Sequence, residues 1–543
     1  MRASFAAVSF FGLLILAPVT IDAAHADAAS DCAALRGIQV ASEKIARPTQ
    51  GAVIDAADLV AADAKDNVNG EFCKVLGSIK PLDPAAPDIK FQVNLPSAWN
   101  GKVLHYGGAG YNGVLVTGLL NTRFFKPGAD TPLKRGYATF GSDSGHQSTP
   151  IDGRFGLNAE ALRNFGGDQL KKTYDVATEL VSRRYGRKPD KVYFFGNSQG
   201  GHEGFIVIQR WPQQYDGVVA IHPVYNFTAL QIDGNARSRA LYGGLGYDSE
   251  SGWLNPAKLK LLQSAVMNAC DKLDGAEDGV VSNVAGCRAT FKLASLRCEG
   301  GRDTGDTCLS DRQIRAVEAI DSPVEFGFAL QAGIAIFPRW PILEGGDWGA
   351  LFGFGTRPKP ANPPEPMKDF GLAVLSDPLI RYSVLRGAPN DLLQFDPKAQ
   401  AARLLEVSEM IDANRVDIDA FKSRGGKLLL MHGTVDTAVP PANTVAYYER
   451  LVKQYGQNEL DGFVRFYLAP GFGHGTGQFV VGWDALTTLE RWVENSVAPG
   501  PQVVVDTKEG NRARTRPLCV YPAWPKFTGS NVDDATSFTC VKE

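Results

Sequence analysis

The segment G-N-S-Q-G at positions 196–200 constrains the fold more than any other part of this 543-residue chain. The residues before it, K-V-Y-F-F at 191–195, are mostly aromatic or β-branched, as expected of a buried strand, and residues 200–209 after it have the character of a helix. A strand, a sharp turn and a helix that meet at a serine form a nucleophile elbow, which presents the hydroxyl above the edge of a sheet. Because 58 glycines make chance matches common, the flanking elements carry this prediction. The simpler alternative is that Ser198 is a turn serine at the end of a strand.

Strands and helices alternate on both sides of this turn. We predict strands at 102–106, 137–140, 191–195, 217–221, 427–431 and 464–468, and helices at 168–185 and 200–209. This alternation predicts a mostly parallel sheet that helices cover on both faces. It is lost between residues 226 and 425, a stretch long enough for a domain of its own. We therefore predict a first sheet segment at 27–225, an inserted lid domain at 226–425 and a second sheet segment at 426–543.

The N-terminus has the pattern of a signal peptide, which we place at residues 1–26. Arg2 precedes an apolar stretch at 5–19, and Ala24 and Ala26 offer a small-residue cleavage site; an uncleaved anchor is the alternative. No later stretch is apolar enough to span a bilayer. The eight cysteines and an exported chain predict four disulfides and a secreted or periplasmic location, with the pairing open.

Composition excludes some partners. The net charge of -3 gives no reason to expect nucleic acid or an anionic membrane surface as a partner. The sequence leaves the oligomeric state open.

A serine hydroxyl is a poor nucleophile unless a base takes its proton. In the chain order Ser, Asp, His of this type of elbow, the base follows Ser198, and the candidates are His202, His222, His432 and His474. We select His474, because the glycine-rich loop P-G-F-G-H-G-T-G follows the strand at 464–468 and can bring an imidazole over the sheet edge. His432 is interpreted as a pocket wall or a hydrogen-bonded histidine, and His202 as pointing away from Ser198.

Two further features complete the predicted site. Asp436 follows the strand at 427–431 and can orient His474 and stabilise its charged form; alone, it could equally be a turn aspartate. The acyl oxygen needs backbone donors, which we assign to the N–H of Gln199 and to the loop G-G-A-G-Y-N-G at 107–113. In that loop Gly110 is the first choice and Ala109 the second, unless the loop is a plain glycine turn.

A second candidate site lies in the predicted lid, at D-K-L-D-G-A-E-D-G-V-V (271–281). Asp271, Asp274 and Asp278 offer hard oxygen ligands that suit calcium, and the backbone carbonyls of Ala276 and Val280 could complete the shell. A solvated acidic turn is the alternative. Because the loop is far from Ser198 in sequence, we assign it to the stability of the lid.

With these residues in view, the chain resembles the tannase and feruloyl esterase family of α/β-hydrolases over nearly all of its mature length. The resemblance rests on G-G-A-G-Y-N-G, G-N-S-Q-G-G-H-E-G, C-D-K-L-D-G-A-E-D-G-V-V, H-G-T-V-D, P-G-F-G-H and R-T-R-P-L-C-V-Y-P, in that order. It implies an α/β-hydrolase fold with a large inserted lid, and it favours structural calcium in the lid. It also implies the disulfides Cys32–Cys73, Cys270–Cys287, Cys298–Cys308 and Cys519–Cys540.

The chain departs from this family at two places. The family typically has a disulfide between the residue before the nucleophile and the residue after the base, where this chain has Asn197 and Gly475. We therefore predict a looser and less heat-resistant site. His222 stands where the family often has a small residue, and it could shape the acyl pocket.

We predict a serine hydrolase that cleaves carboxylic esters through an acyl-enzyme, without a cofactor in catalysis. By resemblance, the acyl part is aromatic: galloyl, feruloyl or a related phenolic or terephthalate acid. The lid aromatics available for contact, more often core than ligand contacts, are Trp340, Trp348, Phe352, Phe354 and Phe370. No lid arginine can be assigned to a substrate carboxylate, which weakens the terephthalate half-ester alternative. The same fold would also allow a serine peptidase or a non-catalytic, calcium-stabilised binding protein.

Overall fold

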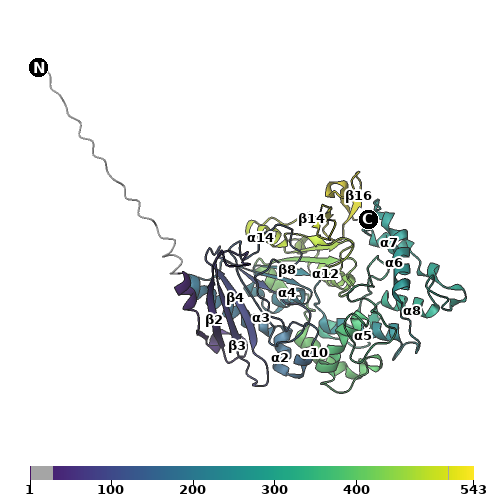
Figure 1. Ribbon diagram of the computed structural model, residues 1–543, viewed down its shortest axis with the longest axis horizontal. Coiled ribbons are helices and arrows are strands. Elements are labelled where there is room, and N and C mark those ends of the chain that lie inside the picture. The colour runs from purple at the N-terminus through teal and green to yellow at the C-terminus, as the bar shows by residue number, and fades with distance from the viewer. Residues whose placement is uncertain (2–27, 512, 543) are drawn as a thin grey trace.

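The computed structural model describes residue 1, residues 28–511 and residues 513–542 of the chain (Figure 1). The predicted signal peptide therefore lies, apart from Met1, outside the described residues.

A ten-stranded sheet forms the centre of the fold, in the order β1-β2-β3-β4-β6-β5-β7-β8-β11-β12. Its strands are β1 (Gln39–Val40), β2 (Ala52–Val60), β3 (Phe72–Ile79), β4 (Ile89–Pro96), β5 (Lys102–Tyr106), β6 (Ala138–Ser142), β7 (Lys191–Asn197), β8 (Gly217–Ile221), β11 (Lys427–Gly433) and β12 (Val464–Ala469). The strands from β6 to β12 in this order are mutually parallel, as predicted. The order reverses between β6, β5 and β7, and in open α/β sheets such a point is where ligands bind, beyond the carboxyl ends of the strands.

The first four strands were not predicted. They pair antiparallel with one another, and β4 joins the parallel part through an antiparallel pairing with β6. The first predicted strand begins at residue 102, because the preceding segment is rich in Ala and Asp and lacks a strong apolar pattern. In Figure 1, β2, β3 and β4 lie together at one end of the molecule, away from the labelled helices of the inserted segment.

Alternate residues of the parallel strands pack on opposite faces of the sheet, as the two-residue period of a strand requires. Phe194, Val218 and Leu428 contribute to one core, and Tyr193, Val219 and Leu429 to the other. Helices α3 (Gln169–Tyr185), α4 (Gln199–Arg210) and α12 (Pro441–Tyr455) pack in the first core, and α14 (Ala485–Asn495) in the second. The shorter helices of this part are α2 (Ala159–Arg163), α11 (Asp419–Ser423) and α13 (Gln457–Leu460).

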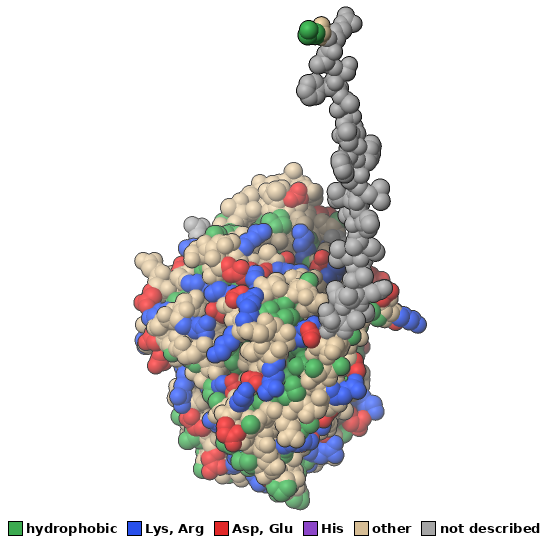
Figure 2. All heavy atoms as spheres, turned by 90° about the vertical axis from the view of Figure 1, so that its left-hand side faces the viewer, with side chains coloured by type: hydrophobic (Ala, Val, Ile, Leu, Met, Phe, Trp, Pro, Cys, Tyr) green, Lys and Arg blue, Asp and Glu red, His purple; other side chains and the backbone are tan. Residues whose placement is uncertain are grey.

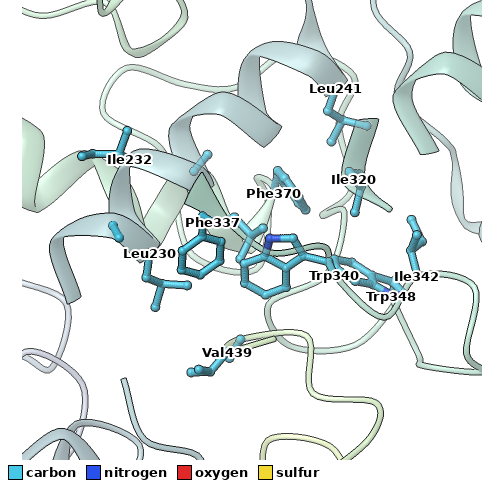
Figure 3. Close-up of a cluster of buried hydrophobic side chains, with 14 of the residues drawn as sticks. Leu230, Ile232, Leu241, Ile320, Phe337, Trp340, Ile342, Trp348, Phe370 and Val439 are labelled. Atoms are coloured by element: carbon cyan, nitrogen blue, oxygen red, sulfur yellow. The ribbon is translucent and has the colours of Figure 1, made fainter. Parts of the chain in front are cut away.

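The segment 226–425 leaves the sheet after β8 and returns to it at β11, the strand beside β8. Its elements are α5 (Phe227–Tyr242), α6 (Pro256–Cys270), α7 (Val284–Thr290), α8 (Asp311–Ile320), β9 (Val324–Glu325), β10 (Ile336–Phe337), α9 (Gly371–Pro378) and α10 (Ala401–Ile411). Every residue of α5 is buried, because the rest of the segment packs around it. Figure 3 shows part of this core: Trp340 lies beside Phe337 and near α5, and Val439, from the loop after β11, reaches the same cluster.

The C-terminal part adds a three-stranded sheet and a hairpin. These strands are β13 (Val481–Gly482), β14 (Gln502–Asp506), β15 (Thr515–Leu518), β16 (Trp524–Phe527) and β17 (Phe538–Val541). The four predicted disulfides are present, with Cα–Cα distances of 4.9 to 5.7 Å: Cys32–Cys73, Cys270–Cys287, Cys298–Cys308 and Cys519–Cys540.

The surface carries charges of both signs. On the face shown in Figure 2, basic and acidic side chains are interspersed, and neither sign dominates. Among the helices of the described ranges, none combines the length and apolar character that a membrane span requires.

Candidate active site

Ser198 lies at a strained turn between β7, which ends at Asn197, and α4, which begins at Gln199. Its φ of 59° and ψ of -118° fall where a residue with a side chain is rarely found, and such strain persists only where the surroundings enforce it. The tightness of the turn also explains Gly196, because a Cβ there would lie 1.9 Å from the carbonyl oxygen of Gly200. The structure therefore forms the predicted elbow, with the serine side chain only partly buried.

The structure brings Ser198, His474 and Asp436 together at the carboxyl edge of the sheet. His474 Nε2 lies 2.9 Å from Ser198 Oγ, and His474 Nδ1 lies 2.8 Å from Asp436 Oδ2. Because a carboxylate can only accept, the imidazole proton sits on Nδ1, and Nε2 is free to accept the serine hydroxyl proton. The arrangement can draw a proton from the hydroxyl and hold the imidazolium that results.

Asp436 is fully buried and held on both oxygens. Oδ1 accepts the N–H groups of Ala438 and Val439 at 2.8 and 2.9 Å. Burial raises the pKa of Asp436, but the charge of His474 and the hydrogen bonds from His432 and His474 outweigh burial and hold that pKa well below its usual value. The carboxylate therefore stays ionised at neutral pH and stabilises any positive charge that forms on His474.

Two other histidines are held in place by hydrogen bonds. His432 is fully buried, with Nδ1 2.8 Å from Thr444 Oγ1 and Nε2 2.9 Å from the carbonyl oxygen of Val439. It is therefore a hydrogen-bonded histidine and not a pocket wall, and its Nε2 also lies 3.4 Å from Asp436 Oδ2. His202 points away from Ser198, because its Nε2 bonds to the carbonyl oxygen of Ile411 at 2.7 Å.

His222 lies beneath the triad and faces no open pocket, because it is fully buried. A role of His222 in shaping the acyl pocket stays a prediction, and its burial means that it would act through the residues packed against it. Its ring centroid lies 5.2 Å from that of His474, and its Nδ1 lies 3.2 Å from Asn197 Oδ1. Burial lowers the pKa of His222 well below its usual value, so the ring is neutral, and its Nε2 has no hydrogen-bond partner among the described residues.

The loop 107–113 keeps two backbone donors free. Each of its other N–H groups has an acceptor. Gly107 donates to Phe195 O, and Gly108 donates to Glu203 Oε2. The remaining three donate to carbonyl oxygens: Tyr111 to Pro150, Asn112 to Ala109 and Gly113 to Asp143. Within the described residues, the N–H groups of Ala109 and Gly110 meet no acceptor. These are our two candidate oxyanion donors. Gly110 has a φ of 56°, and a Cβ there would lie 2.3 Å from Pro150 O, so only glycine fits.

The aromatic candidates of the inserted segment divide into core residues and one residue near the triad. The indole and phenyl rings of Trp340, Trp348, Phe354 and Phe370 are buried in the core of the inserted segment. Phe352 is half-exposed, and its ring meets that of His474 edge-on at a centroid distance of 5.9 Å. Of these five candidates, Phe352 is therefore the one placed to contact a substrate.

The acidic loop 271–280 gathers its three carboxylates against backbone N–H groups. Asp271 Oδ1 accepts from Gly279, Asp274 Oδ1 from Ala276, and Asp278 Oδ1 from Val280, each at 3.0 Å. Burial raises the pKa of Asp271, and the charge of Asp278 raises it further. The pKa of Asp274 is raised by the same two causes. Carboxylates are hard oxygen donors of the kind that calcium prefers, but in this structure each of the three already accepts a backbone N–H group, and Asp278 Oδ2 pairs with Arg516.

Sequence reasoning missed two charged residues near the elbow. Glu203 on α4 is buried and holds the loop 107–113, and only its place on the glycine-rich face G-G-H-E-G hinted at a special role. Arg123 lies outside the inserted segment: its Nη2 would come within 3.8 Å of a Cβ placed on Gly475, the residue after His474. Its guanidinium stacks over Phe124, and no carboxylate of the described residues pairs with it.

Comparison with known proteins settles the family. Residues 73–541 match the model of the family described as tannase and feruloyl esterase. The chain belongs to the tannase and feruloyl esterase family. An uncharacterized esterase of Agrobacterium fabrum is 40% identical over 531 residues, which cover 96% of this chain and 95% of that protein.

A curated relative and a solved structure support the same family assignment. The mono(2-hydroxyethyl) terephthalate hydrolase of Piscinibacter sakaiensis is 31% identical and covers 91% of this chain and 89% of its own length. The crystal structure of feruloyl esterase B from Aspergillus oryzae superposes with a TM-score of 0.74 at 23% identity, over 94% of this chain and all of that one, which shows the shared fold. The family makes the chain a carboxylic ester hydrolase.

Proposed function

We propose that this chain is a serine esterase that cleaves esters of aromatic carboxylic acids through an acyl-enzyme. The observation that carries the proposal is the continuous contact from Ser198 Oγ to His474 Nε2 at 2.9 Å, and from His474 Nδ1 to Asp436 Oδ2 at 2.8 Å. A fully buried carboxylate with a depressed pKa, an oriented imidazole and a strained, partly exposed serine together favour nucleophilic catalysis.

In the first half of the reaction, Ser198 Oγ attacks the ester carbonyl carbon while His474 Nε2 takes the hydroxyl proton. The carbonyl oxygen becomes an oxyanion, which the N–H groups of Gly110 and Gln199 stabilise; Gln199 is the first residue of α4, so its N–H has no acceptor within the helix. His474 then returns the proton to the alcohol oxygen, the carbon–oxygen bond breaks, and the acyl group stays on Ser198.

In the second half, a water molecule loses a proton to His474 Nε2 and attacks the acyl carbon. The Ser198–acyl bond breaks, the serine recovers its proton from His474, and the carboxylic acid leaves. Asp436 keeps its charge throughout and holds the imidazole in the tautomer that both halves require. An Asp436→Asn variant should therefore lose about 10⁴-fold in kcat.

The aromatic character of the acyl part is supported by the names of the relatives and by Phe352. The ring of Phe352 stands edge-on to His474 and is half-exposed, so an aromatic acid bound at Ser198 would meet it. We place the substrate among feruloyl- and galloyl-type esters. The inserted segment 226–425 then acts as the lid that supplies this contact.

Half-esters of aromatic dicarboxylic acids are the second candidate, and Arg123 favours them. Its guanidinium lies next to Gly475, lines cavities of about 420 and 890 Å³ beside the elbow and the His474 loop, and has no carboxylate partner among the described residues. A substrate carboxylate that reached it would gain a charge-assisted hydrogen bond. Arg123→Gln should lower kcat/KM for a terephthalate half-ester but not for the neutral methyl ester of the same acid.

A single panel tests the proposal: a hydroxycinnamate, a gallate and a terephthalate ester, with an amide matched to the best of them. We expect turnover of an ester and none of the amide, whereas amide hydrolysis at a comparable rate would favour a serine peptidase. A fluorophosphonate probe should label the wild-type chain and fail on Ser198→Ala. Undiminished labelling of Ser198→Ala, or activity of that variant, would exclude Ser198 as the nucleophile.

The loop 271–280 is proposed to hold a structural calcium ion with Asp271, Asp274 and Asp278 and the carbonyls of Ala276 and Val280. The raised pKa values of Asp271 and Asp274 support it, because a divalent cation would relieve the repulsion. The ion would stabilise the lid and take no part in catalysis.

Export from the cytosol is proposed as well. Four disulfides support it, because such bonds form and persist in oxidising compartments.

A further inference from the structure

Glu203 connects the helix that follows the nucleophile to the loop that offers the free backbone donors. Its side chain is 1% exposed and lies on α4, five residues after Ser198. Glu203 Oε2 accepts the N–H of Gly108 at 2.7 Å, and Oε1 accepts Asn112 Nδ2 at 2.6 Å. One carboxylate therefore holds two points of the loop 107–113, one on each side of Ala109 and Gly110.

The loop depends on this support because it lies backbone against backbone on α4. A Cβ on Gly107 would come within 2.6 Å of Gly200 Cα and 2.9 Å of Glu203 Oε2. Asn112 has a φ of 57°, a left-handed conformation that its contact with Glu203 helps to hold. The side chain of Glu203 thus ties the segment that carries the Ala109 and Gly110 N–H groups to the helix that follows Ser198, beside the backbone hydrogen bonds of the loop to Phe195, Pro150 and Asp143.

The partners of Glu203 are suited to a carboxylate. Gly108 N–H, Asn112 Nδ2 and Gln169 Nε2, the last at 3.1 Å, all donate. Burial raises the pKa of Glu203 to about 7. Tyr215 is a buried titratable neighbour whose hydroxyl bonds to His105. Burial, and to a smaller extent the charge of Glu203, raises the pKa of Tyr215. No lysine or arginine of the described residues pairs with the carboxylate, so the hydrogen bonds alone hold it.

We infer that Glu203 is a positioning residue for ester hydrolysis, which fixes the oxyanion donors of the loop 107–113 through Gly108 and Asn112. The inference rests on the proposed function, because the role of these donors does. Glu203 does not touch the substrate, and its effect is on the geometry of the oxyanion that forms in the transition state. Loss of Glu203 should therefore lower kcat and leave the binding of substrate almost unchanged.

The experiment measures kcat and KM for the best ester of the panel in Glu203→Leu, Glu203→Gln and Asn112→Gly. Glu203→Leu removes both acceptors and should lower kcat about 100-fold, as the loss of one oxyanion donor does, with KM within about threefold. Glu203→Gln keeps one acceptor and should lose less. Asn112→Gly removes the Nδ2 donor without strain at φ 57°. The double variant Glu203→Gln/Asn112→Gly should lose less than the product of the single losses, because both act on one loop.

A second readout separates positioning from general destabilisation. An arylboronic acid forms a tetrahedral adduct with the serine, and its affinity should fall in parallel with kcat, whereas inhibition by the product acid should not change. Glu160→Gln is the matched control: Glu160 is also a buried glutamate that accepts backbone N–H groups, from Leu82 and Asp83, but in another loop. That variant should lose melting temperature and keep kcat and boronate affinity.

The outcomes are distinguishable. If Ser198→Ala remains active, the proposed function fails and the inference fails with it. If Ser198→Ala is inactive, and Glu203→Gln and Asn112→Gly keep wild-type kcat and boronate affinity, only the inference about Glu203 is overturned. A loss of product-acid binding equal to the loss in kcat would also overturn it, as would strict additivity of the double variant. If Glu203→Leu does not fold, Glu203→Gln and Asn112→Gly still decide.

Discussion

Asn197 Oδ1 accepts a hydrogen bond from His222 Nδ1 at 3.2 Å, and this contact ties the residue before the nucleophile to the residue after β8. The His222 ring in turn lies against the rings of His432 and His474, at centroid distances of 5.0 and 5.2 Å. Neither Asn197 nor Gly475 can form a disulfide. The turn at Asn197 and the loop of His474 are therefore connected beneath the triad through His222, by its hydrogen bond to Asn197 and by its packing against His474.

A covalent link at this place should stabilise the chain. We predict that Asn197→Cys with Gly475→Cys forms a disulfide and raises the melting temperature. In the chain-entropy model, a bridge closing a loop of 100 residues gives about 4.7 kcal/mol, and this loop is longer. Gly475 has a φ of 93°, so a cysteine there brings backbone strain of about 1–3 kcal/mol, which offsets part of the gain.

Differential scanning calorimetry of the double variant, with mass spectrometry to count free thiols, measures this effect. The single variants are the controls, because each carries its own local cost and neither can form the bridge. A bridged variant that melts no higher than the wild type would show that the present contacts already constrain these loops. Absence of the bridge under oxidising conditions would show that the two positions do not approach closely enough.

Asp412 should make stability depend on pH. It is fully buried, and burial raises its pKa to about 7, although Ser408 Oγ and the N–H of Thr228 donate to it. The folded chain then holds a proton between pH 4 and 7 that the unfolded carboxyl, with a pKa of about 3.9, has released. The contribution of Asp412 to stability is therefore full below about pH 4 and is lost as the pH rises through about 7.

We predict that Asp412→Asn, which removes this titration, becomes more stable relative to the wild type as the pH rises from 4.5 to 8. Urea unfolding at both pH values measures the difference, with native disulfides kept intact. Asp417→Asn is the control, because Asp417 is exposed in the same segment. An equal difference between Asp412→Asn and the wild type at both pH values would contradict the assignment.

The site was predictable because the chemistry follows the ends of strands. Ser198, Asp436 and the His474 loop each come after a parallel strand, and carboxyl ends of parallel strands share one edge of the sheet. Glu203 was not predicted, because a glutamate in a helix gives no sign of which loop packs against it. Phe352 could not be separated from the buried lid aromatics, since its φ of 68° turns the chain in a way that no spacing reveals.

The calcium proposal predicts a ligand-dependent melting temperature. Under this proposal calcium binds the folded loop and not the unfolded chain, so a concentration 100 times the dissociation constant should add about 2.7 kcal/mol to the free energy of unfolding. Chelation should lower the melting temperature, and calcium, but not magnesium at the same concentration, should restore it. Asp274→Asn should remove the response, whereas Asp303→Asn, in another loop of the inserted segment, should keep it. A response that survives in Asp274→Asn would place the ion elsewhere.

Trp340 should contribute more to stability than its size alone predicts. Its Nε1 donates to Asp233 Oδ2 at 2.6 Å inside the core of the inserted segment, where Asp233 also pairs with Arg237 at 2.8 Å. Trp348 lies in the same cluster and is buried, but its Nε1 meets no hydrogen-bond partner in the part of the chain that the structure describes. Trp340→Phe and Trp348→Phe therefore remove similar volumes, and only Trp340→Phe also removes a hydrogen bond to a buried carboxylate.

We expect Trp340→Phe to cost about 1.5–3 kcal/mol more than Trp348→Phe, measured by chemical denaturation with the disulfides intact. Equal losses would mean that Arg237 alone satisfies Asp233. Val439 packs in this cluster, and its N–H donates to Asp436. At temperatures below the unfolding transition, Trp340→Phe should therefore also lower kcat, and Trp348→Phe should lower it less.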